Sequence, residues 1–476
     1  MKRKTCHLYV DGRWIDGAEI VEVRSPFDSS IVGRHHRAGP AEIEAALAAA
    51  ERAFREHRHD APVDRAGWLE RIAAAVEERR EEFAQTICAE AGKPIRLARA
   101  EVERSLHTLR WSAEESKRIG GELLPLDVVD VGRGHTGFTR RFPVGVVLAI
   151  TPFNFPLNLV CHKVGPAIAA GCAIVLRPAS QTPLTSLLLA EAAEAARLPA
   201  GLLNVVPSPV QLAESMVVDP RVKLVTFTGS PLVGWPLKSR AAHRKVVLEL
   251  GGNAAVVLDE GYDPLREIPK IAASAFGYAG QSCISVQRVL VPARDERAFV
   301  DAFAAYAREQ IPHGDPALEE TVVGPLIRSE EADRLMGWIA EARDRGAEIA
   351  CGGHRSGNVV EPTILRDVDP RLRISCQEAF GPVAVVDSHE SLEQAIEKVN
   401  DSEFGLQAGL FTHDLDRAFR FYRDVEAGGV TINEVPTWRV DHMPYGGVKH
   451  SGFGREGIRW AIEEMTELKL LVLRLR

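Results

Sequence analysis

The sequence is organised around a cysteine in a short polar loop, Cys283, which could act as a nucleophile. A Gly-Gln-Ser run precedes it, and the loop lies between a predicted helix over residues 264–278 and a predicted strand over 285–291. A structural cysteine usually sits in an apolar run, where it packs like a small hydrophobic side chain. The neighbours of Cys283 instead predict a sulfur that a substrate can reach. From this segment alone, a half-buried structural thiol stays the alternative.

Two further polar side chains follow stretches that we predict to be buried strands. Asn154 lies between aromatic residues in the proline-stiffened loop 151–156, where its amide could donate to an oxygen that gains negative charge. The alternative is a turn asparagine that caps the next helix. Glu249 ends another such strand before two glycines. Apolar surroundings disfavour an ionised carboxylate, so Glu249 is a candidate general base, with a structural salt bridge as the alternative.

Three loops could bind a ligand through backbone or acidic groups. Thr228, Gly229 and Ser230 open a predicted helix, whose free N–H groups suit a phosphate. The loop lacks the GxGxxG fingerprint, so an ordinary helix cap is the alternative. Loop 377–383 is acidic and aromatic, and loop 444–457 is dense in glycine, which also fits a surface loop with positive φ.

Length and composition indicate a cytoplasmic enzyme. A chain of 476 residues can hold two or three domains, and its hydrophobic fraction of 45% is ordinary for a globular protein. The net charge of −8 is spread in both signs, so no basic surface for nucleic acid is expected. Seven scattered cysteines predict neither a disulfide framework nor a metal site. The basic N-terminus lacks a signal-peptide core, and no apolar run is long enough to cross a membrane.

The elements that must position these residues follow a regular order. Apolar periodicity predicts three amphipathic helices over residues 43–54, 69–87 and 95–109. Strands and helices then alternate, which predicts an α/β fold with a parallel sheet. The predicted strands are 144–150, 173–176, 203–206 and 222–227, and the helices are 157–170, 183–196, 209–217 and one from 231. Ligands bind beyond the carboxyl ends of such strands, so we expect a site at loops 151–156, 177–180 and 228–234.

A second α/β unit is predicted after Glu249. Its predicted strands are 254–258 and 285–291, and its helices are 297–310, 329–346, 392–399 and 415–425. The apolar C-terminal run 468–476 reads as a strand that would invite aggregation if left bare. We therefore expect it to pair with another subunit, the alternative being burial within its own subunit.

Together these stretches closely resemble the NAD(P)-dependent aldehyde dehydrogenase superfamily over nearly the whole chain. The most specific segments are 152–156, 249–252, 280–283 and 378–382. The resemblance implies a Rossmann-type parallel-sheet cofactor domain (1–120 and 141–248), an α/β catalytic domain (249–450) and a small oligomerisation segment (121–140 and 463–476). It also implies a homodimer or homotetramer.

The chemistry implied by the resemblance is oxidation of a small aldehyde to its acid. Cys283 would attack as thiolate, Asn154 and the backbone N–H of Cys283 would hold the alkoxide, and the nicotinamide would take the hydride. Glu249 would then activate the water that hydrolyses the thioester. Relatives that transfer the acyl group to coenzyme A or phosphate generally lack this glutamate, so water is the favoured acceptor. A coenzyme A-acylating enzyme and a catalytically silent binding or structural relative are the alternatives.

The cofactor implied by the resemblance is NAD or NADP. Its contacts would come from the following residues: Thr151, Pro152, Phe153, Arg177, Ala179, Ser180, Thr228, Gly229, Ser230, Leu250, Gly251, Glu378 and Phe380. Two of these depart from the family pattern, since Arg177 and Ser180 stand where a lysine and often a glutamate are found. Without that carboxylate a 2′-phosphate is not repelled, and a guanidinium could bind one, so NADP and NAD stay open. Phe153 replaces a tryptophan found in many members, which is a mild change.

The substrate is less well specified by the sequence. The run 438–443 resembles the branch that includes lactaldehyde and phosphonoacetaldehyde dehydrogenases. Arg439 and Arg110 could therefore bind an anionic tail on the aldehyde, with a surface or inter-helix ion pair as the alternative for each. His162, on the helix after the Asn154 loop, is a further candidate, although a polar contact within the helix face is the favoured reading.

Overall fold

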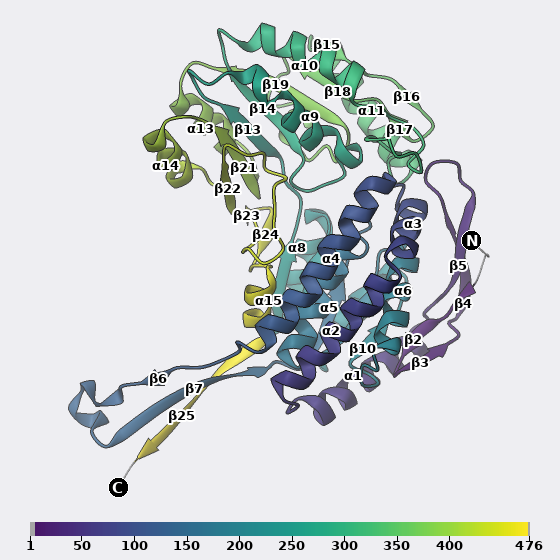
Figure 1. Cartoon of the computed structure of the whole chain (residues 1–476), viewed down its shortest axis with the longest axis vertical. Coiled ribbons are helices and arrows are strands. Elements are labelled where there is room, and N and C mark those ends of the chain that lie inside the picture. The colour runs from purple at the N-terminus through teal and green to yellow at the C-terminus, as the bar shows by residue number, and fades with distance from the viewer. Residues whose placement is uncertain (1–4, 475–476) are drawn as a thin grey trace.

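Two sheets, each with its own helices, form the body of the protein, and a narrow three-stranded arm extends away from it (Figure 1). The computed structural model describes residues 5–474. Two large hydrophobic clusters lie one against each sheet, so the chain has two main cores. The predicted α/β class is confirmed.

The first sheet has eight strands, and its five central strands are parallel, as predicted. In order across the sheet the strands are β24 (Gly452–Phe453), β12 (Lys245–Glu249), β11 (Val222–Thr228), β8 (Val146–Ile150), β9 (Ala173–Arg177), β10 (Leu203–Val205), β2 (Leu8–Val10) and β3 (Arg13–Ile15). All five residues of β8 are buried, as the continuous apolar run predicts. The chain continues from β8 to β9 and β10 on one side and returns to β11 and β12 on the other. The strand order therefore reverses at β8, and in such sheets a ligand crevice opens at the reversal.

Nine helices accompany this sheet. They are α1 (Pro40–His57), α2 (Pro62–Glu78), α3 (Arg80–Ala91), α4 (Ile95–Ser116), α5 (Asn158–Ala170), α6 (Pro183–Ala195), α7 (Val210–Val218), α8 (Pro231–Arg240) and α15 (Ile458–Glu464). The single helix predicted over 69–87 is wrong, because Arg79 leaves the helical conformation (φ −111°, ψ 21°) and separates α2 from α3. The apolar repeat continues across this break, so the sequence pattern does not reveal it.

The second sheet has seven strands, of which the sequence predicted only two. Across the sheet they are β15 (Glu348–Cys351), β18 (Thr363–Arg366), β19 (Val383–His389), β14 (Val286–Pro292), β13 (Ala254–Leu258), β21 (Gln407–Phe411) and β22 (Gly429–Ile432). Its helices are α9 (Ile268–Phe276), α10 (Glu296–Gln310), α11 (Ser329–Asp344), α12 (Arg373–Cys376), α13 (Leu392–Asn400) and α14 (Leu415–Asp424). Helix α9 ends two residues before the predicted end at 278, because the chain turns there toward Cys283.

The arm consists of β6 (Leu123–Leu124), β7 (His135–Pro143) and β25 (Thr466–Arg474). Strand β25 pairs with β7 of its own chain along its whole length, and its other edge has no strand beside it among residues 5–474, so pairing of that edge with another subunit stays a prediction. The alternative of burial is not found, since Leu468, Leu470 and Leu471 are each more than half exposed. The last two residues of the predicted strand, 475–476, lie outside the described residues.

The remaining strands are short or peripheral. A small N-terminal sheet contains β1 (Thr5–Cys6), β5 (Ile31–Arg37) and β4 (Glu19–Arg24), and two pairs are formed by β16 (Arg355–Ser356) with β17 (Val359–Val360) and by β20 (Phe404–Gly405) with β23 (Val448–Lys449). Between residues 5 and 474, no helix is both long and apolar enough to cross a bilayer.

Candidate active site

A cavity of about 1350 Å³ opens between the two sheets, and it contains all three residues predicted to carry the chemistry. Asn154 comes from the loop after β8, Glu249 from the end of β12, and Cys283 from the segment before β14. Loops after β9 and β11 also line it, as expected for the carboxyl edge of a parallel sheet. Residues that are far apart in the sequence therefore share one cavity.

The turn before Cys283 brings the sulfur into this cavity. Tyr278 and Ala279 both have φ of +53°, a left-handed conformation that non-glycine residues rarely adopt. Gly280 follows with φ of +65°, and a Cβ there would lie 2.1 Å from the carbonyl oxygen of Gly381. Because only glycine fits at that position, the polar Gly-Gln-Ser run has a direct structural role. Such local strain is typical of functional sites.

The environment of the Cys283 sulfur disfavours its charged form. Burial raises the pKa of Cys283 to about 12, and the hydrogen bond with Tyr445 acts in the opposite direction. Its Sγ atom lies 3.0 Å from the Tyr445 hydroxyl oxygen. Tyr445 was not predicted from the sequence, although it lies in the glycine-dense loop 444–457.

The amide of Asn154 bridges the two halves of the cavity. Its Nδ2 donates to the backbone carbonyl of Gln281 at 3.0 Å, two residues before the cysteine. The second hydrogen of this amide is free to donate to another oxygen, while Oδ1 is buried without a partner. Asn154 is therefore placed beside the loop of Cys283 and not at a helix cap, since the helix after the loop begins at Asn158.

The carboxylate of Glu249 is buried, and neither of its oxygens has a hydrogen-bond partner. Burial raises the pKa of Glu249 well above its ordinary value, and the negative charge of Glu456 raises it further. The alternative of a structural salt bridge is therefore not what the structure contains. A Cβ on Gly252 would lie 2.2 Å from the Cys283 carbonyl oxygen, so the missing side chain of Gly252 lets the segment after β12 lie close to the cysteine loop.

A buried lysine and glutamate beside Glu249 were missed from the sequence. Lys163 of α5 donates to Glu456 at 2.7 Å and to the Thr226 hydroxyl at 2.9 Å. Burial opposes ionisation of Glu456, but the charge and hydrogen bond of Lys163, together with nearby His162 and Arg439, lower the pKa of Glu456 overall. A lysine within the otherwise apolar stretch of α5 was the available signal, since buried lysines are almost always paired.

All thirteen predicted cofactor residues line the cavity. The Thr151 hydroxyl is buried there without a partner. Arg177 donates to the Ser208 carbonyl at 2.9 Å and to the Ser180 hydroxyl at 3.3 Å, with no carboxylate partner among the described residues. A hydroxyl without a partner and a guanidinium without a carboxylate, both at the edge of a parallel sheet, fit an anionic dinucleotide.

The acidic-aromatic loop forms another part of the same wall. Glu378 accepts the Gly252 N–H at 3.0 Å, and burial raises the pKa of Glu378 to about 7. The rings of Phe380 and Phe153 meet edge to face with centroids 5.9 Å apart. Two aromatic rings and one carboxylate thus border the cavity near the cysteine loop.

Of the three predicted substrate residues, one reaches the cavity. Arg439 lines it, with its guanidinium 3.7 Å from the centroid of the Tyr445 ring, and its Nε and Nη2 are buried without acceptors. Arg110 does not, because it is half exposed and donates to Glu77 of α2 at 2.6 Å, the inter-helix ion pair considered as the alternative. His162 is buried against Asp441 with Nε2 2.9 Å from Oδ1, and it does not line the cavity.

Two further cations of the cavity wall were missed. Arg104 of α4 contacts Asp441 through two nitrogens, at 2.7 and 3.2 Å. Lys93 pairs with Glu101 and lies over the Phe155 ring. Arg104 lies on α4 and Lys93 in the turn between α3 and α4, and the sequence pattern of these helices only indicated a covering role, so nothing in the periodicity distinguished the two cations.

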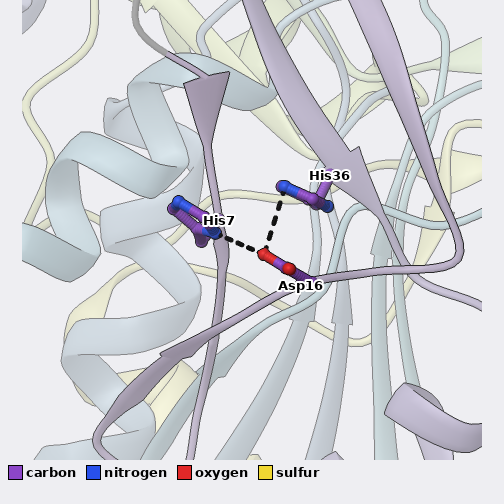
Figure 2. A group of neighbouring side chains, drawn as sticks. All are labelled: His7, Asp16 and His36. Carbon is purple, nitrogen blue, oxygen red and sulfur yellow. Dashed lines mark hydrogen bonds and ion pairs between the residues drawn. The ribbon is translucent and has the colours of Figure 1, made fainter.

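One group among the described residues has the donor types of a metal site, and it lies outside the cavity (Figure 2). Asp16 is 2.8 Å from His7 Nδ1 and 3.3 Å from His36 Nε2. His36 Nδ1 accepts the Gly17 N–H at 3.0 Å, so its own proton is on Nε2, facing Asp16. A metal at Nε2 would displace that proton and leave both ring nitrogens deprotonated. The tautomer therefore favours a hydrogen-bonded His–Asp–His group.

Comparison with known proteins gives a consistent result over the whole chain. The profile of the aldehyde dehydrogenase family matches residues 14–471. A 3-sulfolactaldehyde dehydrogenase of Priestia aryabhattai is 44% identical over 469 residues, which cover 98% of each chain.

Solved structures agree with this match. Aldehyde dehydrogenase 21 from Physcomitrella patens, in complex with the reaction product succinate, has a TM-score of 0.97 at 38% identity and covers 100% of this chain and 99% of its own. NADP-dependent glyceraldehyde-3-phosphate dehydrogenase from Bacillus halodurans, complexed with NADP, has a TM-score of 0.96 at 32% identity, covering 99% and 100%.

Proposed function

The chain belongs to the aldehyde dehydrogenase family, and from the geometry of its cavity we propose that it oxidises a small anionic aldehyde to the carboxylic acid through a covalent adduct on Cys283. It is an NAD(P)-dependent oxidoreductase. The observation that carries the proposal is the convergence of a thiol, a free amide hydrogen and an unpaired carboxylate on one cavity.

The first step assigned to these residues is attack of the Cys283 sulfur on the aldehyde carbon. The thiolate is the nucleophile, so the thiol must first lose its proton. The oxygen that becomes an alkoxide in the thiohemiacetal is held by the second hydrogen of the Asn154 amide and by the backbone N–H of Cys283. Asn154 supports this role because its bond to the Gln281 carbonyl fixes its position without using both of its donors.

The second step is hydrolysis of the thioester, which is what remains on Cys283 once the thiohemiacetal carbon has lost its hydride. The nicotinamide supplies the redox chemistry by accepting the hydride when the cofactor is bound. Glu249 then takes a proton from the attacking water, and both of its oxygens are available because neither has a partner. A raised pKa brings a carboxylate closer to the range in which a general base is effective. This favours water over coenzyme A as acyl acceptor, and it speaks against a catalytically silent protein.

We assign the substrate's anionic group to Arg439. Its buried Nε and Nη2 have no acceptor in the described chain, and unpaired buried donors cost free energy until a ligand satisfies them. By contrast, Arg104 is already satisfied by Asp441. The similar proteins named above include a 3-sulfolactaldehyde dehydrogenase and a succinate complex, which are in keeping with a short aldehyde that carries a sulfonate or carboxylate.

We assign binding of the NAD(P) cofactor to the thirteen residues predicted for it, all of which line the cavity. Arg177 and Ser180 would meet the adenosine ribose, and a guanidinium without a carboxylate partner favours a 2′-phosphate there. We therefore propose that NADP is used at least as well as NAD. The corresponding domains are residues 1–120 with 141–248 for the cofactor and 249–450 for catalysis.

The arm is assigned to assembly with a second copy of the chain. Strand β25 is an edge strand, and five of its apolar side chains are exposed: Leu468, Leu470, Leu471, Val472 and Leu473. Such an edge is normally covered. We propose a homodimer or homotetramer through segments 121–140 and 463–476. The cysteines between residues 5 and 474 form no disulfide, which suits a reducing cytoplasm.

Product analysis of purified enzyme tests the proposal. With a carboxylated or sulfonated short aldehyde and NAD(P)+, we expect the free acid in equal amounts with and without coenzyme A. The Cys283→Ser variant should form no reduced cofactor. Retained turnover in Cys283→Ser, or an acyl-coenzyme A product, would contradict it.

A further inference from the structure

A tyrosine hydroxyl contacts the sulfur of Cys283 in the cavity. The Tyr445 hydroxyl oxygen lies 3.0 Å from Sγ and has no other hydrogen-bond partner among residues 5–474. Tyr445 is 5% exposed. Burying a hydroxyl costs free energy, and its only partner here is the sulfur, so the hydroxyl is not needed merely to fill space.

The hydroxyl is held firmly in place. The Tyr445 N–H donates to the Glu456 carbonyl at 3.0 Å, and the Arg439 guanidinium lies 3.7 Å from the ring centroid. Ile284 and Leu406 pack with the ring in a small apolar cluster. A donor that is fixed before the reaction needs no reorganisation when charge develops next to it.

Four groups act electrostatically on the sulfur in addition to burial. Glu378 and Glu249 disfavour a negative charge there, whereas Tyr445 and Arg439 favour it. In the described chain, only Tyr445 makes a side-chain hydrogen bond to Sγ. Its hydroxyl proton is free to point at the sulfur, since nothing else accepts it.

We propose that the Tyr445 hydroxyl donates a hydrogen bond to the Cys283 thiolate and thereby stabilises the attacking form of the nucleophile. The inference rests on the proposed role of Cys283. It makes Tyr445 a residue that touches a reacting atom. It also gives a chemical reason for a tyrosine directly before Gly446 and Gly447, where a purely apolar ring would pack equally well.

The rate of Cys283 alkylation by iodoacetamide tests this inference without substrate or cofactor. The full-length protein is treated over a range of pH, and modification is followed on the peptide that contains Cys283, because the other cysteines also react. A hydrogen bond to a charged group is worth about ten- to a hundredfold in an equilibrium constant. Loss of the hydrogen bond raises the thiol pKa but makes the thiolate a better nucleophile, which offsets about half of the effect. Tyr445→Phe should therefore alkylate about three- to tenfold more slowly at each pH below the pKa of the Cys283 thiol.

Tyr262→Phe is the matched control. Tyr262 is also buried, and its hydroxyl donates to Glu267 at 2.7 Å in the core of the second sheet. Its substitution should leave the alkylation rate of Cys283 unchanged. The inference is overturned if Tyr445→Phe reacts as fast as the wild type, or if Tyr262→Phe slows the reaction equally.

A second substitution protects the test against a folding defect in Tyr445→Phe. Replacing Tyr445 with difluorotyrosine keeps the ring and makes the hydroxyl a stronger donor, so alkylation of Cys283 should become faster. No change, or a slower reaction, would refute the inference. The proposed function is tested separately: it fails if Cys283→Ser still turns over substrate. The alkylation rates need no turnover, so they test the role of Tyr445 whatever the result for Cys283→Ser.

Discussion

Removing the charge of Arg439 is expected to weaken the enzyme selectively toward anionic aldehydes. Two guanidinium nitrogens of Arg439 are buried without acceptors, so an anionic group of the substrate would complete their hydrogen bonds. A hydrogen bond between charged groups contributes about 1.5–3 kcal/mol. At about 1.4 kcal/mol for each factor of ten, Arg439→Gln should lower kcat/KM for a sulfonated or carboxylated aldehyde by about ten- to a hundredfold.

The assay compares that aldehyde with a neutral aldehyde of similar size in the same variants. Because Arg439 also packs on the Tyr445 ring, a general disturbance of the cavity would lower both rates. Arg439→Lys retains the charge but loses the flat guanidinium, so it should retain part of the preference for the anion. Arg110→Gln is the control outside the cavity and should leave the ratio of the two rates unchanged. Equal losses for the charged and neutral aldehydes in Arg439→Gln would refute the assignment of Arg439.

Three further outcomes follow from the same site. Asn154→Ala should lower kcat by about a hundred- to a thousandfold with little change in KM, because its amide acts on charge that appears during the reaction. A rise in KM as large as the fall in kcat would argue against an oxyanion role. Arg177→Leu should lower kcat/KM for NADP by about ten- to a hundredfold more than for NAD, and an unchanged ratio would contradict a phosphate contact. Burial raises the pKa of Glu249, so the folded protein loses stability as pH rises from about 4.3, the ordinary glutamate value, toward that raised pKa. The difference in Tm between Glu249→Gln and the wild type should therefore grow in favour of the variant over this window; a constant difference would contradict a buried, uncompensated carboxylate.

The sequence predicted the positions of the first sheet and of the reacting groups because both depend on local patterns. Short continuous apolar runs such as 146–150, alternating with helical patterns, are typical of buried parallel strands, and loops at the carboxyl ends of such strands share one edge of the sheet. Asn154 and Glu249 come from such ends, and Cys283 had a neighbourhood that did not suit a packed thiol. Their approach in space followed from topology and from resemblance.

The sequence failed where pairing in space determines the role of a residue. Arg110 and Arg104 lie on the same helix, yet one binds Glu77 outside the cavity and the other binds Asp441 at its wall. The helical period does not specify which partner each guanidinium meets. Tyr445 was overlooked for a similar reason, since its contact with Cys283 joins residues 162 positions apart. The break at Arg79 was hidden because the apolar period continues through it.

The most direct test of the central claim is to trap the acyl group on the chain. Glu249→Gln should still form the thioester but hydrolyse it slowly, because the base that activates water is gone. Mixed with aldehyde and NAD(P)+, this variant should release about one reduced cofactor per site in a burst. Its intact mass should rise by the acyl group, and digestion should locate the adduct on Cys283. Steady turnover of Glu249→Gln at the wild-type rate, or an adduct on another residue, would contradict the account.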